Sequence, residues 1–129
     1  MIIIGVTSFL FNLPWTFLGL LPALLSLPVR ASFHVRPFAF LIEVRSFWWQ
    51  SWLPGHKGVR ASTIGNIVLL GPRLLPHDLE HELIHVQQYE HEPLIHPFLY
   101  IYQVLRHGYR NNKYEVEAYQ KAGNTYVEK

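Results

Sequence analysis

The sequence predicts a small α+β domain in which two or three strands precede three helices, with a hydrophobic helical segment ahead of them. Three observations predict this class. Residues 1–29 carry no charge, two stretches between residues 38 and 70 are rich in β-branched and aromatic side chains, and helical periodicity begins after residue 76. The chain has 129 residues, half of them hydrophobic, which is the size and composition of one folded domain.

Residues 1–29 are the first element, and the first charged residue of the chain is Arg30. The run exceeds the roughly 20 residues that a helix needs to cross a bilayer, and three prolines interrupt it. We expect a membrane segment, either one kinked span or two shorter helices in a membrane-embedded hairpin. A hairpin buried in a soluble core is the alternative. Residues 30–129 are expected to form a separate domain.

Charge sets the expected orientation and excludes one class of partner. Arg30, Arg36 and Arg45 follow the hydrophobic segment and nothing basic precedes it, so the positive-inside rule places the remainder in the cytoplasm. No Lys/Arg cluster interleaves with aromatic residues, so no nucleic-acid partner is expected.

The chain has no cysteine, which leaves only His, Asp and Glu as zinc ligands.

Two strands are expected next. Residues 38–49 form the first, and the tryptophans at its end, Trp48, Trp49 and Trp52, are either an interfacial anchor or core packing. Residues 61–70 form the second, and Gly65-Asn66 is either a bulge within it or a tight turn between two short strands.

Three helices follow. Pro76 suits the first position of a helix that runs to about His91, and acidic residues in its opening turns complement the helix dipole. Apolar residues at helical spacing predict a second helix over 97–107 and a third over 112–122. The tail after Gly123 is expected to be frayed.

The first of these helices contains His81-Glu82-Leu83-Ile84-His85, an H-E-x-x-H pattern. A period of 3.6 residues puts His81 and His85 on one face, where two imidazoles can share a metal ion. Glu82 lies beside that face, as a general base for a metal-activated water requires. His77 extends the series, but it lies about 12 Å from His85 along the helix and is excluded as a third ligand by distance.

A catalytic zinc usually has three protein ligands, so the third is expected from another helix. Glu115 and Glu117 are the candidates, and they point about 200° apart, so only one can face the metal. Glu115 adjoins the apolar side of its helix and is favoured. Its competing role is a capping box with Asn112.

These residues resemble the gluzincin class of zinc metallopeptidases, which combines H-E-x-x-H with a downstream helical glutamate, often in an E-x-x-A pattern. Glu115-Val116-Glu117-Ala118 matches that pattern, although Tyr119 stands where the class often has an aspartate. Over about residues 63–122 the chain is similar to small, largely uncharacterised bacterial zincin-like proteins. The resemblance implies zinc on His81, His85 and Glu115.

The implied activity is that of a metalloendopeptidase-like hydrolase, with Glu82 as general base and a peptide or protein as substrate. The strand before the metal helix would pair with extended substrate. Tyr109 and His107 rank first as donors to the oxyanion, ahead of Arg110 and Tyr114. The expected location is a bacterial inner membrane, in contact with lipid and with the zinc domain in the cytoplasm. A protein partner could complete the cleft.

Two rival hypotheses stay open at this point. In the first, the chain is a non-catalytic zinc scaffold or pseudo-peptidase, in which a fourth side chain such as His77 or Glu117 closes the coordination sphere. In the second, it is a membrane protein whose histidine-rich face holds no metal.

Overall fold

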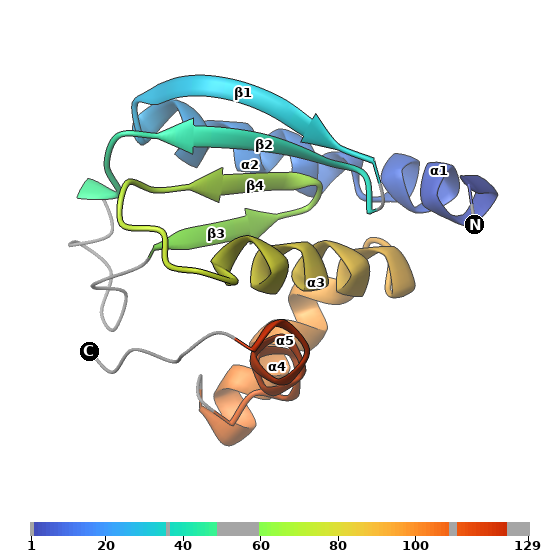
Figure 1. The fold of residues 1–129 in the computed structure, drawn as a ribbon. Coiled ribbons are helices and arrows are strands. Elements are labelled where there is room, and N and C mark those ends of the chain that lie inside the picture. The colour runs from blue at the N-terminus through green and yellow to red at the C-terminus, as the bar shows by residue number, and fades with distance from the viewer. Residues whose placement is uncertain (1, 36, 49–59, 109–110, 124–129) are drawn as a thin grey trace.

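A computed structural model describes residues 2–35, 37–48, 60–108 and 111–123. Within them the fold is a mixed α+β arrangement of one sheet and flanking helices (Figure 1). The elements in chain order are α1 (Ile2–Phe11), α2 (Leu13–Leu25), β1 (Pro28–His34), β2 (Ala39–Val44), β3 (Ala61–Ile64), β4 (Ile67–Leu70), α3 (Asp78–His91), α4 (His96–His107) and α5 (Lys113–Ala122).

The sheet has four described strands in the order β1-β2-β4-β3. β1 and β2 are antiparallel, β2 and β4 are parallel, and β3 and β4 form an antiparallel hairpin. Ile64 pairs directly with Ile67, so Gly65-Asn66 is the tight turn of this hairpin and not a bulge. β3 is therefore an edge of the sheet, and it lies beside α3 (Figure 1).

Alternate residues of β4 build two separate cores, because successive side chains of a strand point to opposite faces. Ile67 and Leu69 pack with Ala23 of α2, on one face of the sheet. Val68 and Leu70 pack with Val86 of α3, on the other face. The sheet thus lies between α2 and the motif helix α3. All four residues of β4 are buried, which explains a continuous apolar run without alternation.

Most element boundaries follow the expectations, with three differences. The strand expected over residues 38–49 is shorter, since β2 ends at Val44. β1 is an additional strand that the sequence did not indicate, and the expected boundary at Arg30 falls inside it. α3 begins at Asp78 and not at Pro76. The reason is local: His77 adopts a left-handed φ of 70°, and the Asp78 carboxylate accepts a hydrogen bond from the Leu75 N–H at 2.8 Å.

The hydrophobic segment folds as two helices of 10 and 13 residues, separated at Asn12. Among the described residues, no helix is both long enough and apolar enough to cross a bilayer. The segment also contacts the rest of the fold, since α2 packs on the sheet and α1 lies against α3. Trp49, Trp52 and the tail after Gly123 lie outside the described residues.

Asn12 is the main polar link between this segment and the remainder of the chain. Its side chain is fully buried and donates to the Tyr89 carbonyl at 2.9 Å, near the end of α3. Its amide oxygen accepts from the Leu94 N–H at 2.8 Å. Ser8, one turn earlier, donates to the Glu90 carbonyl at 2.7 Å. These bonds satisfy backbone groups that the end of α3 would otherwise leave unpaired.

We predict that Gly65→Ala destabilises the protein more than Gly123→Ala does. Gly65 has a φ of +61°, and a Cβ there would lie 2.6 Å from the Thr16 backbone nitrogen on α2. Strain and overlap together should lower the free energy of unfolding by about 2–5 kcal/mol. Urea denaturation measures this.

Gly123 is the matched control, because its φ is +75° and a Cβ there would meet nothing within 4 Å. Its substitution should cost only about 1 kcal/mol. Equal losses in the two variants would contradict close packing of α2 against the hairpin.

Candidate metal centre

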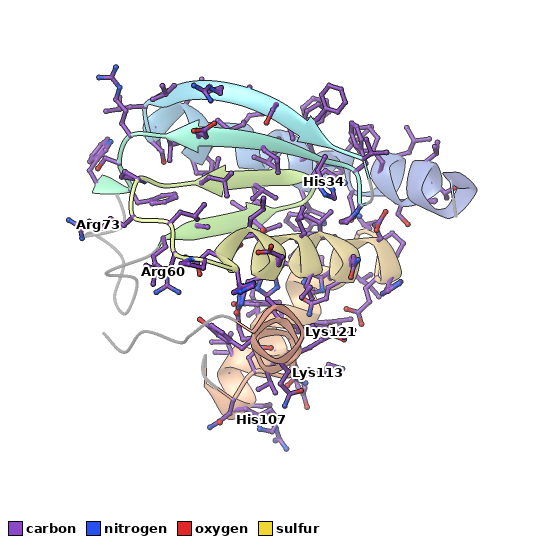
Figure 2. The ribbon with its side chains drawn as sticks, viewed as in Figure 1. His34, Arg60, Arg73, His107, Lys113 and Lys121 are labelled. Carbon is purple, nitrogen blue, oxygen red and sulfur yellow. The ribbon has the colours of Figure 1, made fainter. Side chains whose placement is uncertain are left out.

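His81 and His85 lie one turn apart on α3, and both side chains are buried. Their Nε2 atoms are 3.1 Å apart, so the two imidazoles point at a common position. α3 is held in place at its start by Asp78, whose carboxylate accepts two hydrogen bonds from the Arg60 guanidinium, at 2.6 and 3.0 Å. Arg60 lies beside the beginning of α3 in Figure 2.

Glu115 reaches the two histidines from α5. α5 packs on α3 through a small core of Ile84, Ala118 and Ala122, where two alanines allow a close approach of the helices. Glu115 Oε1 lies 3.0 Å from His81 Nε2 and 3.2 Å from His85 Nε2. The predicted three-residue set is therefore brought together, from positions 30 and 34 residues apart in the chain.

The competing role of Glu115 as a capping residue is not its principal one. The Asn112 side chain does cap α5, but it accepts from the Tyr114 N–H at 2.9 Å. The Glu115 carboxylate instead turns inward, to the histidines.

The three atoms fit a metal ion in spacing and in chemistry. Zinc ligands at 2.0–2.1 Å and tetrahedral angles lie about 3.3–3.4 Å from one another. The distances of 3.0, 3.1 and 3.2 Å among His81 Nε2, His85 Nε2 and Glu115 Oε1 are close to that value. Two imidazole nitrogens and a carboxylate oxygen are all electron-pair donors, so a cation between them would satisfy all three. Within the described part of the chain, this is the group of ligand atoms that could hold a metal.

Gln88 fixes the tautomer of His85 that such a site needs. The Gln88 Oε1 atom lies 2.8 Å from His85 Nδ1, so this ring nitrogen carries the proton and Nε2 is left as the donor to a metal. The Gln88 amide nitrogen donates to the Tyr114 carbonyl at 3.0 Å and to Glu117 Oε1 at 2.7 Å. Both ends of the amide are therefore used, which sets its orientation.

Two tyrosines complete the surroundings of the ligands. Tyr100 on α4 donates to Glu115 Oε2 at 2.5 Å, which leaves Oε1 to face the histidines. Tyr119, in the position where the gluzincin class often has an aspartate, packs its ring against His81 with 4.3 Å between centroids.

Three residues of the site were not foreseen from the sequence: Gln88, Tyr100 and Thr63. Gln88 could have been found, because it stands three residues after His85 and so shares its helical face. Tyr100 and Thr63 come from other elements, and no spacing in the sequence connects them with the motif.

Glu82 is buried beside the ligand set and contacts β3. Its Oε1 accepts a hydrogen bond from the Thr63 hydroxyl at 2.7 Å. Burial raises the pKa of Glu82, and the nearby charges of His85 and His81 only partly offset this effect. A carboxylate with a raised pKa is a stronger base than one in water.

Electrostatic coupling between Glu115 and His85 shifts the pKa of each. Burial raises the pKa of Glu115, but the His85 charge and hydrogen bonds from His81, His85 and Tyr100 outweigh it, so the pKa lies far below its usual range. Burial lowers the pKa of His85, but the Glu115 charge outweighs it and raises the pKa to about 9. In the metal-free chain the two groups therefore form a buried ion pair near neutral pH.

The remaining candidates lie elsewhere. His77 is exposed at the start of α3, and Glu117 bonds to Gln88 and, at 3.0 Å, to Lys121. Neither belongs to the ligand group. His107 is exposed at the end of α4, and Figure 2 shows it pointing away from α3. Tyr109 lies outside the described residues, so its predicted role as an oxyanion donor stays a prediction.

Comparison of the chain with protein-family models, with curated proteins and with solved structures gives no match.

We predict that the purified protein binds one zinc ion through Glu115 and not through Glu117. Glu115→Gln should weaken zinc binding by more than about 100-fold, since even loss of a residue that supports a ligand costs 10–100-fold. Glu117→Gln should retain nearly all of the zinc. Elemental analysis and competition with a chelating dye measure both. Zinc loss only in the Glu117 variant would reverse the assignment.

Zinc binding should also depend on pH, because a ligand histidine must be neutral. With the pKa of His85 at about 9, binding near neutral pH should release about one proton per ion, and affinity should rise with pH up to about 9. Calorimetry in two buffers of different ionisation enthalpy measures the proton release. A heat that does not depend on the buffer would contradict the assignment.

The stability of the metal-free chain should have the opposite dependence on pH. A folded-state pKa raised above that of unfolded histidine means that the His85–Glu115 ion pair stabilises the fold at lower pH. That contribution is lost as the pH rises through about 9.

Proposed function

We propose that this chain is a membrane-associated, zinc-dependent metallopeptidase with a zincin-like fold. The observation that carries the proposal is the buried group of His81, His85 and Glu115, whose ligand atoms all lie within 4.8 Å of one another. Glu82 lies beside this group and is held by Thr63. A structural ion would need the three ligands, but it would not need a buried, hydrogen-bonded carboxylate next to them.

His81, His85 and Glu115 would hold the metal. When bound, zinc would supply Lewis acidity, which polarises a substrate carbonyl and lowers the pKa of water toward neutrality. Glu82 would accept the proton of the attacking water and pass it to the leaving amine. Its raised pKa suits both transfers, because the same group has to take a proton and then release it.

The proposed substrate is an extended peptide. β3 is an edge strand of the described sheet and carries Thr63, the residue that holds Glu82. A peptide that added to this edge by main-chain hydrogen bonds would lie beside the general base. No larger lobe faces β3 within the described residues, so a protein partner is proposed to complete the cleft.

The scaffold hypothesis requires a fourth protein ligand, and its two named candidates do not support it. His77 is exposed and Glu117 is engaged by Gln88 and Lys121. The ligand group of the described residues has three members, which is the number that catalytic zinc sites use when they keep one position for water or substrate.

We predict that Glu82→Gln abolishes peptide hydrolysis and spares zinc binding. Removal of a general base should lower kcat by about 10²–10⁴-fold, while the three ligands stay in place. A fluorogenic peptide library measures turnover, and elemental analysis measures the zinc. Glu80→Gln is the matched control, because Glu80 lies exposed in the first turn of the same helix.

Unchanged turnover in the Glu82 variant would exclude this residue as the base. Zinc binding by a wild type that hydrolyses no peptide of the library would favour the scaffold hypothesis.

A further inference from the structure

α4 is an amphipathic helix whose polar side faces the protein and whose apolar side faces outward. The inward side carries His96, which is 2% exposed, and Tyr100, which bonds to Glu115. The outward side carries Phe98, Ile101 and Leu105, which are 61%, 53% and 81% exposed. These positions recur every three or four residues, so they form one stripe. A helix in a soluble surface normally has the reverse arrangement.

The same inversion occurs in the N-terminal helices. The residues of α2 that contact the sheet are small, namely Thr16, Gly19 and Ala23, and its large apolar side chains point outward. In α1 the small residue Ser8 is buried, and the large residue Leu10 is exposed. The exposed large residues of these two helices include Val6, Phe11, Phe17, Leu18, Leu21 and Leu24.

Trp15 joins the two regions. Its indole N–H donates to the Leu94 carbonyl at 2.8 Å, just before α4, and its ring packs edge-on against Phe98 with 5.5 Å between centroids. The α4 stripe is therefore continuous with the flank of α2. Residues 1–29 bring no ionisable side chain to this surface, and α4 ends in the exposed basic residues Arg106 and His107.

We infer that the outward sides of α1, α2 and α4 form one surface that lies in the interface of a lipid bilayer, parallel to the membrane plane. This inference rests on the membrane association within the proposed function, and it names the surface and the partner. Short helices with a wide apolar face and basic residues at the border are suited to this position. Trp15 is suited to it as well, since tryptophan concentrates at membrane interfaces.

Lipid fits this surface better than a second copy of the chain does. An isologous dimer needs one self-complementary patch, and protein interfaces set their register with hydrogen bonds around an apolar centre. The outward sides of α1 and α2 offer large aliphatic and aromatic groups and no charge, spread over helices that also join α4. A fluid bilayer covers such a surface without any register.

The arrangement also connects the membrane surface with the metal centre. α4 presents Ile101 and Leu105 to the lipid, while Tyr100, which lies about 100° and 140° around the helix from them, donates to Glu115. The metal centre thus lies one helix diameter from the bilayer, roughly 10 Å. Peptides at the membrane surface are the substrates that this placement would favour.

Flotation of the full chain with vesicles tests the inference. The vesicles contain phosphatidylcholine alone or phosphatidylcholine with phosphatidylglycerol. We expect the wild type to float with both, and more with the anionic vesicles because of Arg106. The double variant Ile101→Glu with Leu105→Glu should bind at least about 100-fold less, since two large apolar side chains lose their burial in lipid.

Val116→Glu is the matched control, because Val116 is an exposed apolar residue of α5, outside the proposed surface. It should float like the wild type. Leu21→Glu places the same change on α2 and should lower binding independently of α4. Thermal melting of each variant reports whether it is folded.

Undiminished flotation of a folded Ile101→Glu, Leu105→Glu protein would overturn the inference. A second outcome would also overturn the inference. In it, the wild type is a dimer without vesicles, and the double variant is a monomer that still floats like the wild type. Zinc content and Glu82-dependent hydrolysis, measured without vesicles, test the proposed enzyme separately. Either proposal can therefore fail while the other stands.

Discussion

The contact between the Glu115 carboxylate and the two histidines of α3 is the interaction on which the C-terminal half of the fold depends. The three side chains are buried, and a buried charge is tolerated only when it is paired. The neighbouring residues hold the three side chains in this arrangement. Gln88 bonds to Nδ1 of His85 and Tyr100 bonds to Oε2 of Glu115, the atoms that face away from the centre. The alanines of α5 let the two helices approach. Without a positive partner for Glu115, α5 would place an isolated carboxylate inside the protein.

α3 shows how the fold manages a helix with so many buried polar groups. Asp78, His81, Glu82, His85 and Gln88 are all buried, although a helix of this composition belongs on a surface. Each has a partner outside α3: Arg60, before β3, bonds to Asp78, and Thr63 on β3 bonds to Glu82. Residues of α5 bond to His81, His85 and Gln88. These bonds are costly to lose, because a buried polar group that lacks a partner forfeits its hydration. They explain why the motif helix needs contacts on several sides at once.

The sequence predicted the grouping of His81, His85 and Glu115 and most of the helices and strands, because local spacing determines which side chains share a face. The spacing of His81 and His85 fixes their common face, and Glu115 adjoins the apolar side of its own helix. The features that the sequence did not predict also have physical reasons. β1 was missed because it begins within the charge-free run, so composition gave no boundary. The partners Thr63 and Tyr100 are joined to the site only by folding. α4 was predicted as a helix, but periodicity cannot tell whether an apolar stripe faces the core or the outside.

Asn12 has a consequence for how the N-terminal segment relates to the rest of the chain. Its amide is wholly buried. It donates to the carbonyl of Tyr89, in the last turn of α3, and accepts from the N–H of Leu94, which follows α3. Aspartate lacks the donor and leucine lacks both groups, so neither could replace it. A generic hydrophobic anchor, exchanged for residues 2–25, would bring membrane affinity but would leave the Tyr89 carbonyl and the Leu94 N–H unpaired. The segment is therefore a structural part of the fold, and another hydrophobic helix could not replace it.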